Sequence, residues 1–381
     1  MRTNEVSYKV DIWLVIGTRR WARLLVTELC TMLPLDTAIH LQGNLDDMNL
    51  RDWWNKSPLK KRIQIVEQPL PCHALMTGVA FIVNSAYQHK SSIENVLAAG
   101  YNVVSEKPMT FSKQESLELL AKAEELGLRL FCTNTYLFAD YLHVFKKNWL
   151  QGKQFTEINI KWSDPTNEVR YGEHKGYDSA VPVIIDLIPH VTNIILATHG
   201  EIKPDYSEVT VLRGGCEVII KYQCGKMKIC IQMARNSNRR TRLAKFSMLG
   251  EETTIDFSTE PGSVTNRRID SVSADPDWQK KYKPIAGMLN AVREYFDNNT
   301  ADERLSPLAG VMSCELIDRI IESYVDQQVT FLSTSDQLAL SMLAGDIEYA
   351  VKESKSISER VMPYITTYSP LTRLACAYMA D

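Results

Sequence analysis

The sequence predicts a doubly wound parallel α/β sheet in the first part of the chain and a mostly antiparallel open sheet in the next. Two observations carry this prediction. From residue 10 to residue 132, short apolar runs that suit buried strands alternate with segments of helical periodicity. From about residue 155, strand-like runs instead follow one another, and several are joined by tight turns such as Gly225-Lys226. Alternation with helices is typical of parallel strands, whereas tight turns join antiparallel neighbours.

The predicted strands of the first part end in glycine or in polar residues. The first strand, residues 10–16, is rich in β-branched residues and stops at Gly17, after which residues 22–29 repeat apolar positions at helical spacing. Later strands are expected at 38–42, 62–67, 78–85, 101–105 and 128–132, and later helices at 91–99 and 113–127, with a helix or loop at 50–60. Ligands of such sheets bind beyond the carboxyl ends of the strands. Five residues mark that edge: Gly17, Gln42, Asn84, Glu106 and Asn134.

The second part is expected to be an α+β domain. Its strands are predicted at 155–162, 208–212, 216–222, 227–233, 244–249 and 253–257, with a helix at 182–198 and later helices at 284–298 and 307–325. The last fifty residues suggest further helices, including 337–353 and the apolar stretch 371–379. We therefore expect domains at 1–135 and 136–330, followed by a helical C-terminal extension at 331–381.

Composition and charge exclude several classes of protein. The 381 residues are 45% hydrophobic and carry a formal net charge of −3, which offers no general attraction to nucleic acid or to an anionic membrane. No apolar run is long enough to span a membrane, and the start of the chain has no secretory signal pattern. The eight cysteines are scattered without a C-x-x-C pair or metal-ligand spacing, as expected of reduced thiols. These observations predict a cytoplasmic protein without a metal site.

The turn after the first strand matches a dinucleotide-binding fingerprint in two of its three positions. The fingerprint G-x-G-x-x-G/A here reads Gly17, Arg19 and Ala22. The turn glycine and the small helix-packing residue are present, whereas Arg19 replaces the glycine at which the backbone approaches a pyrophosphate. Two interpretations stay open: the nucleotide-binding turn of a Rossmann domain at 1–135, or an ordinary β–α turn.

The end of the second strand bears on the choice of cofactor. An acidic residue there binds the ribose 2′-hydroxyl of NAD, but this strand ends in the neutral residues 42–44. Arg19 and Arg20 are nearby in such a fold and suit a 2′-phosphate. We therefore expect NADP to be favoured over NAD, with NAD still possible because Asp46 and Asp47 follow closely.

Three stretches together resemble the Gfo/Idh/MocA family of NAD(P)-dependent oxidoreductases, the glucose–fructose oxidoreductase and inositol dehydrogenase group. They are the turn at Gly17, the segment 82–108 that ends in Glu106-Lys107-Pro108, and residues 185–190, which look like the family's D-x-G-x-H. The family's E-K-P signature is complete, and the resemblance covers roughly residues 8–330. Departures are Arg19, Ser85, Ile188 and Asn193, which stand in place of the usual glycine, proline, glycine and aspartate.

The resemblance implies which residues carry the proton chemistry. In the family, the lysine and the histidine at the positions of Lys107 and His190 are the usual acid/base candidates. We expect His190 to donate or accept the proton and Lys107 to stabilise charge or relay it. Asp186 precedes His190 by four residues on the same helical face, so we expect it to orient His190 or to bind substrate. Without the resemblance, a core histidine held by an aspartate explains the pair equally well.

Further contacts are expected for cofactor and substrate. Arg235, Arg239, Arg240 and Arg242 form a basic cluster that we interpret as an exposed hairpin rather than as a site for an anionic substrate. The expected substrate residues are Tyr136, Trp162 and Asn193. The expected cofactor-binding residues are Gly17, Thr18, Arg19, Arg20, Trp21, Gln42, Asn84, Ser85, His89, Glu106, Lys107 and Asn134.

The resemblance implies hydride transfer between a nicotinamide cofactor and a small polar substrate, such as the carbonyl or alcohol of a sugar, a cyclitol or a nucleotide-linked sugar. Two alternatives stay open, an NADPH-dependent imine reductase of natural-product assembly and an NADP-binding sensor without turnover. A homodimer or homotetramer is expected, because an open antiparallel sheet leaves one face to cover. Segments 216–222 and 227–233 carry apolar residues on both alternating sets, which favours such a covered face.

Overall fold

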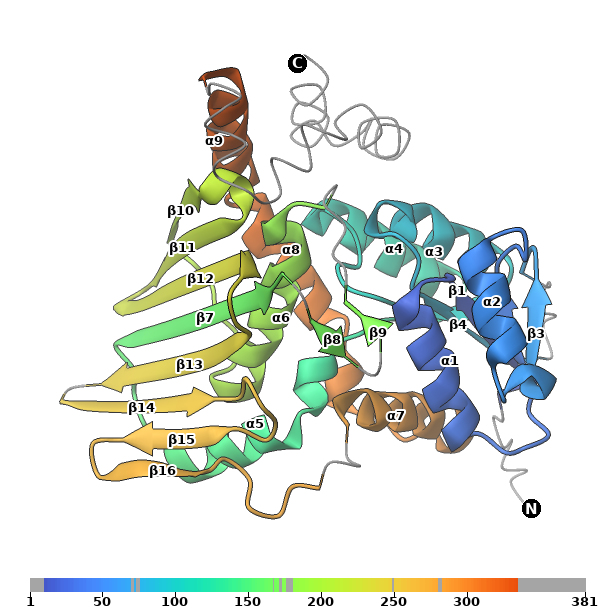
Figure 1. The fold of residues 1–381 in the computed structure, drawn as a ribbon, viewed down its shortest axis with the longest axis horizontal. Helices are drawn as coiled ribbons and strands as arrows, with labels where there is room; N and C mark the ends of the chain where they lie inside the picture. Colours follow the sequence, from blue (N-terminus) through green and yellow to red (C-terminus); the bar gives the residue numbers. More distant parts are fainter. Residues whose placement is uncertain are drawn as a thin grey trace. The chain divides into compact units, whose positions relative to one another are not determined.

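The computed structural model describes residues 10–69, 72, 76–166, 168–170, 173–175, 181–248, 250–279 and 283–334. The chain divides into two compact units, whose elements are labelled in Figure 1. Unit 1 comprises residues 1–138 and 282–311, and unit 2 comprises residues 139–281 and 312–381. Helix α8 (Leu308–Asp318) spans the division. The helices predicted at 337–353 and 371–379 lie outside the described residues.

Unit 1 is built on a six-stranded sheet in which all paired strands are parallel, in the order β3-β2-β1-β4-β5-β6. This confirms the predicted doubly wound sheet. The order reverses between β1 and β4, the place where such sheets bind ligands. The strands are β1 (Ile12–Ile16), β2 (Ile39–Gln42), β3 (Ile63–Val66), β4 (Gly78–Ile82), β5 (Tyr101–Ser105) and β6 (Leu130–Cys132), and the helices are α1 (Arg20–Met32), α2 (Met48–Lys56), α3 (His89–Ala98), α4 (Lys113–Glu125) and α7 (Pro284–Asn298).

Both faces of this sheet are covered by helices, which explains why its strands read as continuous apolar runs. Trp13 and Val15 of β1 belong to a core that includes side chains of α1 and α7. Leu14, between them in sequence, points to the opposite face and joins a core with α3 and α4. The alternation of side chains along β1 therefore serves two separate cores.

Helix α7 differs from the predicted division of the chain. We expect residues 136–330 to form one domain, but α7 packs with unit 1. Met288 and Val292 are fully buried in the same core as Leu25 of α1. Lys283, just before α7, pairs with Glu28 of α1 at 2.8 Å. The chain returns to its first unit because the apolar face of α7 completes the core over α1.

Unit 2 is built on an eight-stranded sheet in the order β10-β11-β12-β7-β13-β14-β15-β16. Its strand pairs are antiparallel except for β7 with β12, so the predicted mostly antiparallel sheet is confirmed. The strands are β7 (Glu157–Pro165), β10 (Tyr206–Leu212), β11 (Glu217–Cys224), β12 (Met227–Ser237), β13 (Thr241–Met248), β14 (Glu251–Asp256), β15 (Ser263–Asn266) and β16 (Ile269–Ser273), with a separate pair β8 (Val169–Arg170) and β9 (Glu173–His174); the helices are α5 (Asp140–Phe145), which continues as a π-helix (Lys146–Leu150), α6 (Val183–Thr198) and α9 (Ile321–Thr334).

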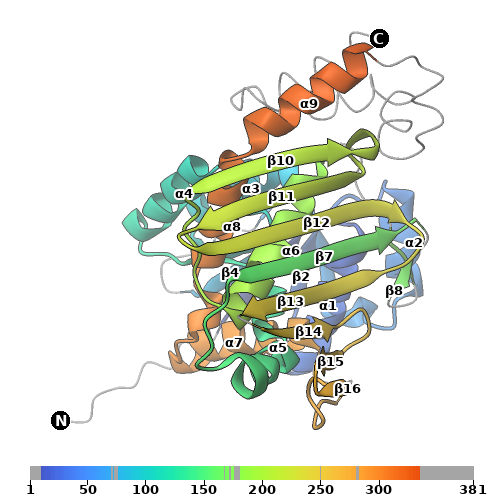
Figure 2. The ribbon, with the colours of Figure 1, turned by 90° about the vertical axis from the view of Figure 1, so that its left-hand side faces the viewer.

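The two faces of the large sheet have different chemistry. Figure 2 looks onto one face, with α6 behind the strands. On the α6 side, one row across neighbouring strands reads Ile220, Ile231, Ile160 and Ala244, all buried. On the other face, the adjacent row reads Lys221, Cys230, Asn159 and Lys245. Few side chains on the outward face are apolar. This face is therefore more polar than expected from segments 216–222 and 227–233, which carry apolar residues on both alternating sets.

The two edge strands of this sheet, β10 and β16, have different surroundings. At the β10 edge, the amide of Gln327 on α9 accepts a hydrogen bond from Val211 N at 2.9 Å and donates one to Val209 O at 2.9 Å. At the other edge, β16 is mostly exposed and carries a single apolar pair, Ile269 and Val272. Strands β15 and β16 are absent from the sequence prediction, because their polar composition gives no alternating apolar signal.

No helix in the described part of the chain is long and apolar enough to cross a membrane.

Candidate active site

The turn between β1 and α1 fits the approach of a phosphate. Gly17 has φ +141°, and a Cβ on it would lie 2.7 Å from the carbonyl oxygen of Val83, so only glycine fits. Helix α1 starts at Arg20, and the side chain of its N-cap residue, Arg19, makes no capping hydrogen bond. The first backbone N–H groups of a helix and its dipole attract anions. The exposed Arg19 lies beside this helix start, as the predicted cofactor site requires.

The end of β2 carries no acid, as predicted, but an acid of the next loop lies at the turn. The side-chain amide of Gln42 donates to the carbonyl oxygen of Glu67 at 3.2 Å. The hydroxyl of Thr18 in the turn lies 3.5 Å from Oδ2 of Asp47, whose Oδ1 accepts from Leu50 N at the start of α2 at 3.3 Å. Asp47 is therefore fixed beside the turn. Its carboxylate would repel a phosphate group that bound there.

The E-K-P segment follows β5 and is held by the two neighbouring strand ends. Glu106 N donates to Ile82 O at 2.7 Å, and Lys107 N donates to the hydroxyl oxygen of Thr133 at 3.2 Å. That hydroxyl in turn donates to the carboxylate of Glu106. Thr133 has no role in the sequence analysis, because a lone threonine after a strand gives no signal. It ties the end of β6 to the backbone of Lys107.

His89 braces the same segment from α3. The side chain is fully buried, and its Nδ1 lies 2.7 Å from the carbonyl oxygen of Pro108. Because a carbonyl only accepts hydrogen bonds, Nδ1 carries the proton. The pKa of His89 is lowered to about 4, chiefly by burial and also by the charge of nearby Lys107, against two backbone hydrogen bonds that raise it. A neutral, buried histidine suits a role in holding the E-K-P segment more than direct contact with a cofactor.

The other expected cofactor and substrate residues of unit 1 also take part in protein contacts. Asn84 donates from its amide to the hydroxyl of Ser92 at 2.8 Å. Asn134 is buried and donates to Ser306 O at 3.3 Å, and Tyr136, two residues later, is also buried. The geometry places Gly17, Asn84, Glu106, Lys107 and Asn134 at the carboxyl edge of one sheet.

In unit 2, helix α6 carries the predicted polar stripe. Asp186, at the first turn, pairs through Oδ2 with Nη2 of Arg235 on β12 at 3.3 Å. The same Nη2 donates to the carbonyl oxygen of Val181 at 2.8 Å, just before the helix. Asn193 is buried, and both polar atoms of its amide lack a hydrogen-bond partner among the described residues. Arg235 thus anchors the start of α6, a partner for Asp186 that the sequence analysis does not assign.

His190 lies against an aromatic ring. Its imidazole stacks on the indole of Trp162 on β7, with ring centroids 4.8 Å apart and planes 7° from parallel. The guanidinium carbon of Arg242 on β13 lies 3.5 Å from the centroid of the same indole. The predicted substrate residue Trp162 is therefore buried between the proposed acid/base residue and a cation.

The expectation of an exposed arginine hairpin is wrong for two of its four members. Arg235 and Arg242 are each 1% exposed, whereas Arg239 is exposed and Arg240 half-buried. The reason is strand alternation: Arg235 is in phase with buried Met233, and Arg242 with buried Ala244, on the face that α6 covers. Counting every second position along each strand from these apolar residues would have identified Arg235 and Arg242 as buried.

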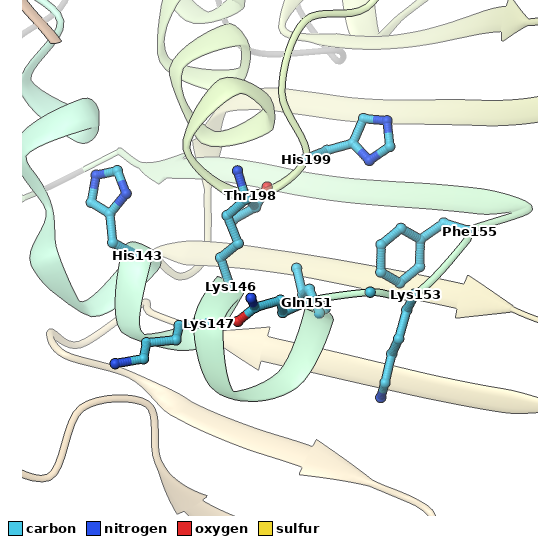
Figure 3. A pocket seen from close by; sticks show the side chains of 10 residues that line it. His143, Lys146, Lys147, Gln151, Lys153, Phe155, Thr198 and His199 are labelled. Carbon is cyan, nitrogen blue, oxygen red and sulfur yellow. The ribbon is translucent and has the colours of Figure 1, made fainter. Parts of the chain in front are cut away.

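A cavity of about 410 Å³ lies elsewhere in unit 2 (Figure 3). Its described lining includes none of the predicted site residues, and the ammonium ends of Lys147 and Lys153 point away from the ring of Phe155. The lining residues are His143, Lys146, Lys147, Leu150, Gln151, Gly152, Lys153, Phe155, Thr198 and His199. Among the described side chains, no group of three or more His, Cys, Asp or Glu residues is arranged to hold a metal ion.

Comparisons with known proteins bear on this geometry. Residues 67–134 match the model of the oxidoreductase family with an NAD-binding Rossmann fold. No curated protein gives a significant sequence match. Many solved structures share the fold, among them three of low sequence identity. UDP-N-acetylglucosamine 3-dehydrogenase GnnA from Acidithiobacillus ferrooxidans is 13% identical, with a TM-score of 0.63 over 82% of this chain and 96% of that chain.

Dehydrogenase MviM from Clostridium difficile is 15% identical, with a TM-score of 0.63 over 83% of this chain and 100% of that chain. An NAD-binding protein from Listeria innocua is 12% identical, with a TM-score of 0.62 over 82% and 97%. The fold thus extends over nearly the whole length of each of these proteins. Together with the family match over residues 67–134, the shared fold confirms the resemblance to the Gfo/Idh/MocA oxidoreductases.

Proposed function

We propose that the chain is an NAD(P)-dependent oxidoreductase, with NADP preferred, that acts on a small polar substrate. The observation that carries the proposal is the carboxyl edge of the unit 1 sheet. There, a turn that admits only glycine precedes helix α1, whose N-cap side chain makes no capping hydrogen bond, and a complete E-K-P segment is braced by Thr133 and His89. The family match over residues 67–134 includes that segment.

The preference for NADP rests on the neutral end of β2 and on Arg19 at the helix start. Asp47, beside Thr18, acts in the opposite direction, because its carboxylate repels a 2′-phosphate. We propose that the exposed arginine outweighs it, since a charge-assisted contact between guanidinium and phosphate is worth about 1.5–3 kcal/mol.

A bound nicotinamide cofactor would supply the hydride chemistry. The protein's part is to hold the reactants and to move a proton at the substrate heteroatom. We assign the proton transfer to the imidazole of His190 and assign Lys107 the stabilisation of charge or a relay of the proton. Asp186, through its pair with Arg235, holds the start of α6 and so supports His190 or contacts substrate.

The substrate class proposed is a sugar, a cyclitol or a nucleotide-linked sugar with an alcohol or carbonyl group. One protein of similar fold is named a UDP-N-acetylglucosamine 3-dehydrogenase, which supports including nucleotide sugars. The test is NADPH oxidation, and NADP reduction, against a panel of these compounds and of cyclic imines. Turnover on a ketosugar or nucleotide sugar supports the proposal, and turnover on an imine alone favours an imine reductase. Tight NADPH binding without turnover on any compound favours a non-catalytic sensor.

A further inference from the structure

The guanidinium of Arg242 is buried and held in one orientation by the protein. Its side chain is fully buried, and Nη1 donates to the carbonyl oxygens of Ser163 and Thr241, both at 2.7 Å. Nη2 pairs with the carboxylate of Asp164. Three acceptors on neighbouring strands therefore fix the plane of the guanidinium. Such a planar, multiply bonded cation is a role that lysine cannot fill.

The carboxylate that holds Arg242 stays charged. Burial alone would raise the pKa of Asp164, but the charges of Arg242 and Lys175 more than offset it and hold that pKa well below its usual range. Lys175 Nζ lies 2.9 Å from Asp164 and 3.3 Å from Glu168, which in turn pairs with Arg240 at 2.8 Å. Charges thus alternate in sign from Arg242 to Arg240, and the guanidinium of Arg242 is the member that reaches the interior.

That interior end meets the indole of Trp162. The register of β7 and β13 places Trp162 directly opposite Arg242, and the guanidinium carbon lies 3.5 Å from the ring centroid. A desolvated cation over an indole face is a favourable contact. The same indole stacks on His190 with planes 7° from parallel. Three elements, β13, β7 and α6, therefore contribute one side chain each to a single stack.

We propose that Arg242 is a positioning residue, which fixes the imidazole of His190 through the ring of Trp162. The proposal rests on the proposed function in so far as His190 is to transfer a proton, because transfer requires the imidazole at a fixed place and angle. Arg242 itself is buried and held by protein acceptors, so it acts on His190 and not on substrate.

The experiment compares two matched double variants of the full chain. Arg242→Met with Asp164→Asn removes the guanidinium over Trp162 together with the carboxylate that would otherwise be left buried. Arg240→Met with Glu168→Gln removes an equivalent pair from the same row of charges, and the contacts of Arg240 are with Glu168 and Ser258. Each variant removes one positive and one negative charge and one carboxylate that pairs with Lys175, so the net charge is the same in both. They differ in the contact with the indole and in the two bonds of Arg242 to the carbonyl oxygens of Ser163 and Thr241, which belong to the proposed positioning.

The readout that does not depend on turnover is the NMR signal of the His190 ring protons, assigned with His190→Gln. Stacking on the indole shifts these protons by its ring current. We expect the shift to be lost in the Arg242→Met variant and kept in the Arg240→Met variant, with a changed pH titration of His190 only in the former. An Arg242→Lys variant, which keeps charge but not the planar contact, should also lose the shift.

With a substrate in hand, the Arg242→Met variant should lower kcat by roughly 10- to 100-fold at unchanged NADPH affinity, the usual effect of misplacing a reacting group. Equal His190 signals in the two double variants would overturn the proposal. A wild-type rate in His190→Ala would instead overturn the proton-transfer role of His190, while the ring-current result would still report on the stack.

Discussion

Lowering the pH should weaken unit 1 through His89, by an amount that follows from its burial. In an unfolded chain this histidine has its ordinary pKa of 6.5, whereas burial lowers the pKa to about 4 in the folded protein. A histidine with a lowered folded-state pKa favours the folded state above pH 6.5, and this contribution is lost as the pH falls toward 4. Complete loss corresponds to roughly 3 kcal/mol, because one pKa unit is worth about 1.36 kcal/mol. At pH 5 the loss is about 2 kcal/mol.

The matched variant is His89→Asn, whose amide Nδ2 replaces the donor to Pro108 but does not titrate. The protein is unfolded in urea at pH 7.5 and at pH 5. Hydrogen exchange of the backbone amides in the β4 and β5 peptides then measures the unfolding free energy of unit 1 by itself. Between these pH values, the unfolding free energy of the wild-type chain should fall by about 2 kcal/mol more than that of the variant. Equal falls in the two proteins would refute the reasoning, because carboxylates common to both cancel in the comparison.

Four further outcomes are expected. Arg19→Ala should weaken NADPH binding by about 1.5–3 kcal/mol and NADH binding less, in fluorescence titrations of both cofactors; equal losses would contradict the preference for NADP. Asp47→Asn should tighten NADPH binding several-fold, because it removes a carboxylate beside the turn that repels a 2′-phosphate, whereas the affinity for NADH should stay the same or fall. Lys107→Met and His190→Ala should each slow single-turnover hydride transfer by roughly 100- to 10,000-fold with little change in cofactor affinity, and wild-type rates in both would defeat the assignment. Sedimentation at micromolar concentration should show a dimer or tetramer that Lys161→Glu on the outward face of the unit 2 sheet weakens, whereas a wild-type monomer would exclude that interface.

Local patterns in the sequence predict much of the fold. Gly17, the alternation of strands with helices, and the polar strand ends at Glu106 and Asn134 are local signals, and the parallel sheet they predict is confirmed. The sequence predicts helix α7 as part of the second domain, because nothing in its own residues reveals which core its apolar face completes.

The surroundings of the candidate site depend on contacts between distant segments. The stack on Trp162 joins residues 162, 190 and 242, and the brace on Pro108 joins α3 to the end of β5. Such pairings are set by strand register and helix packing, which no single stretch of sequence displays. The roles of Lys107, His190 and Asp186 stay predictions.

The side-chain amide of Gln327 has a consequence for the solubility of the protein. An uncovered edge strand offers a row of free N–H and C=O groups on which another chain can assemble, and this is a common route to aggregation. Gln327 occupies one donor and one acceptor of β10 with the spacing that an incoming strand would use. Shortening the chain before α9 would uncover that row beside a wide, twisted sheet. We expect such a truncated chain to self-associate through β10 and to bind an amyloid-sensitive dye, even if its sheet folds as before.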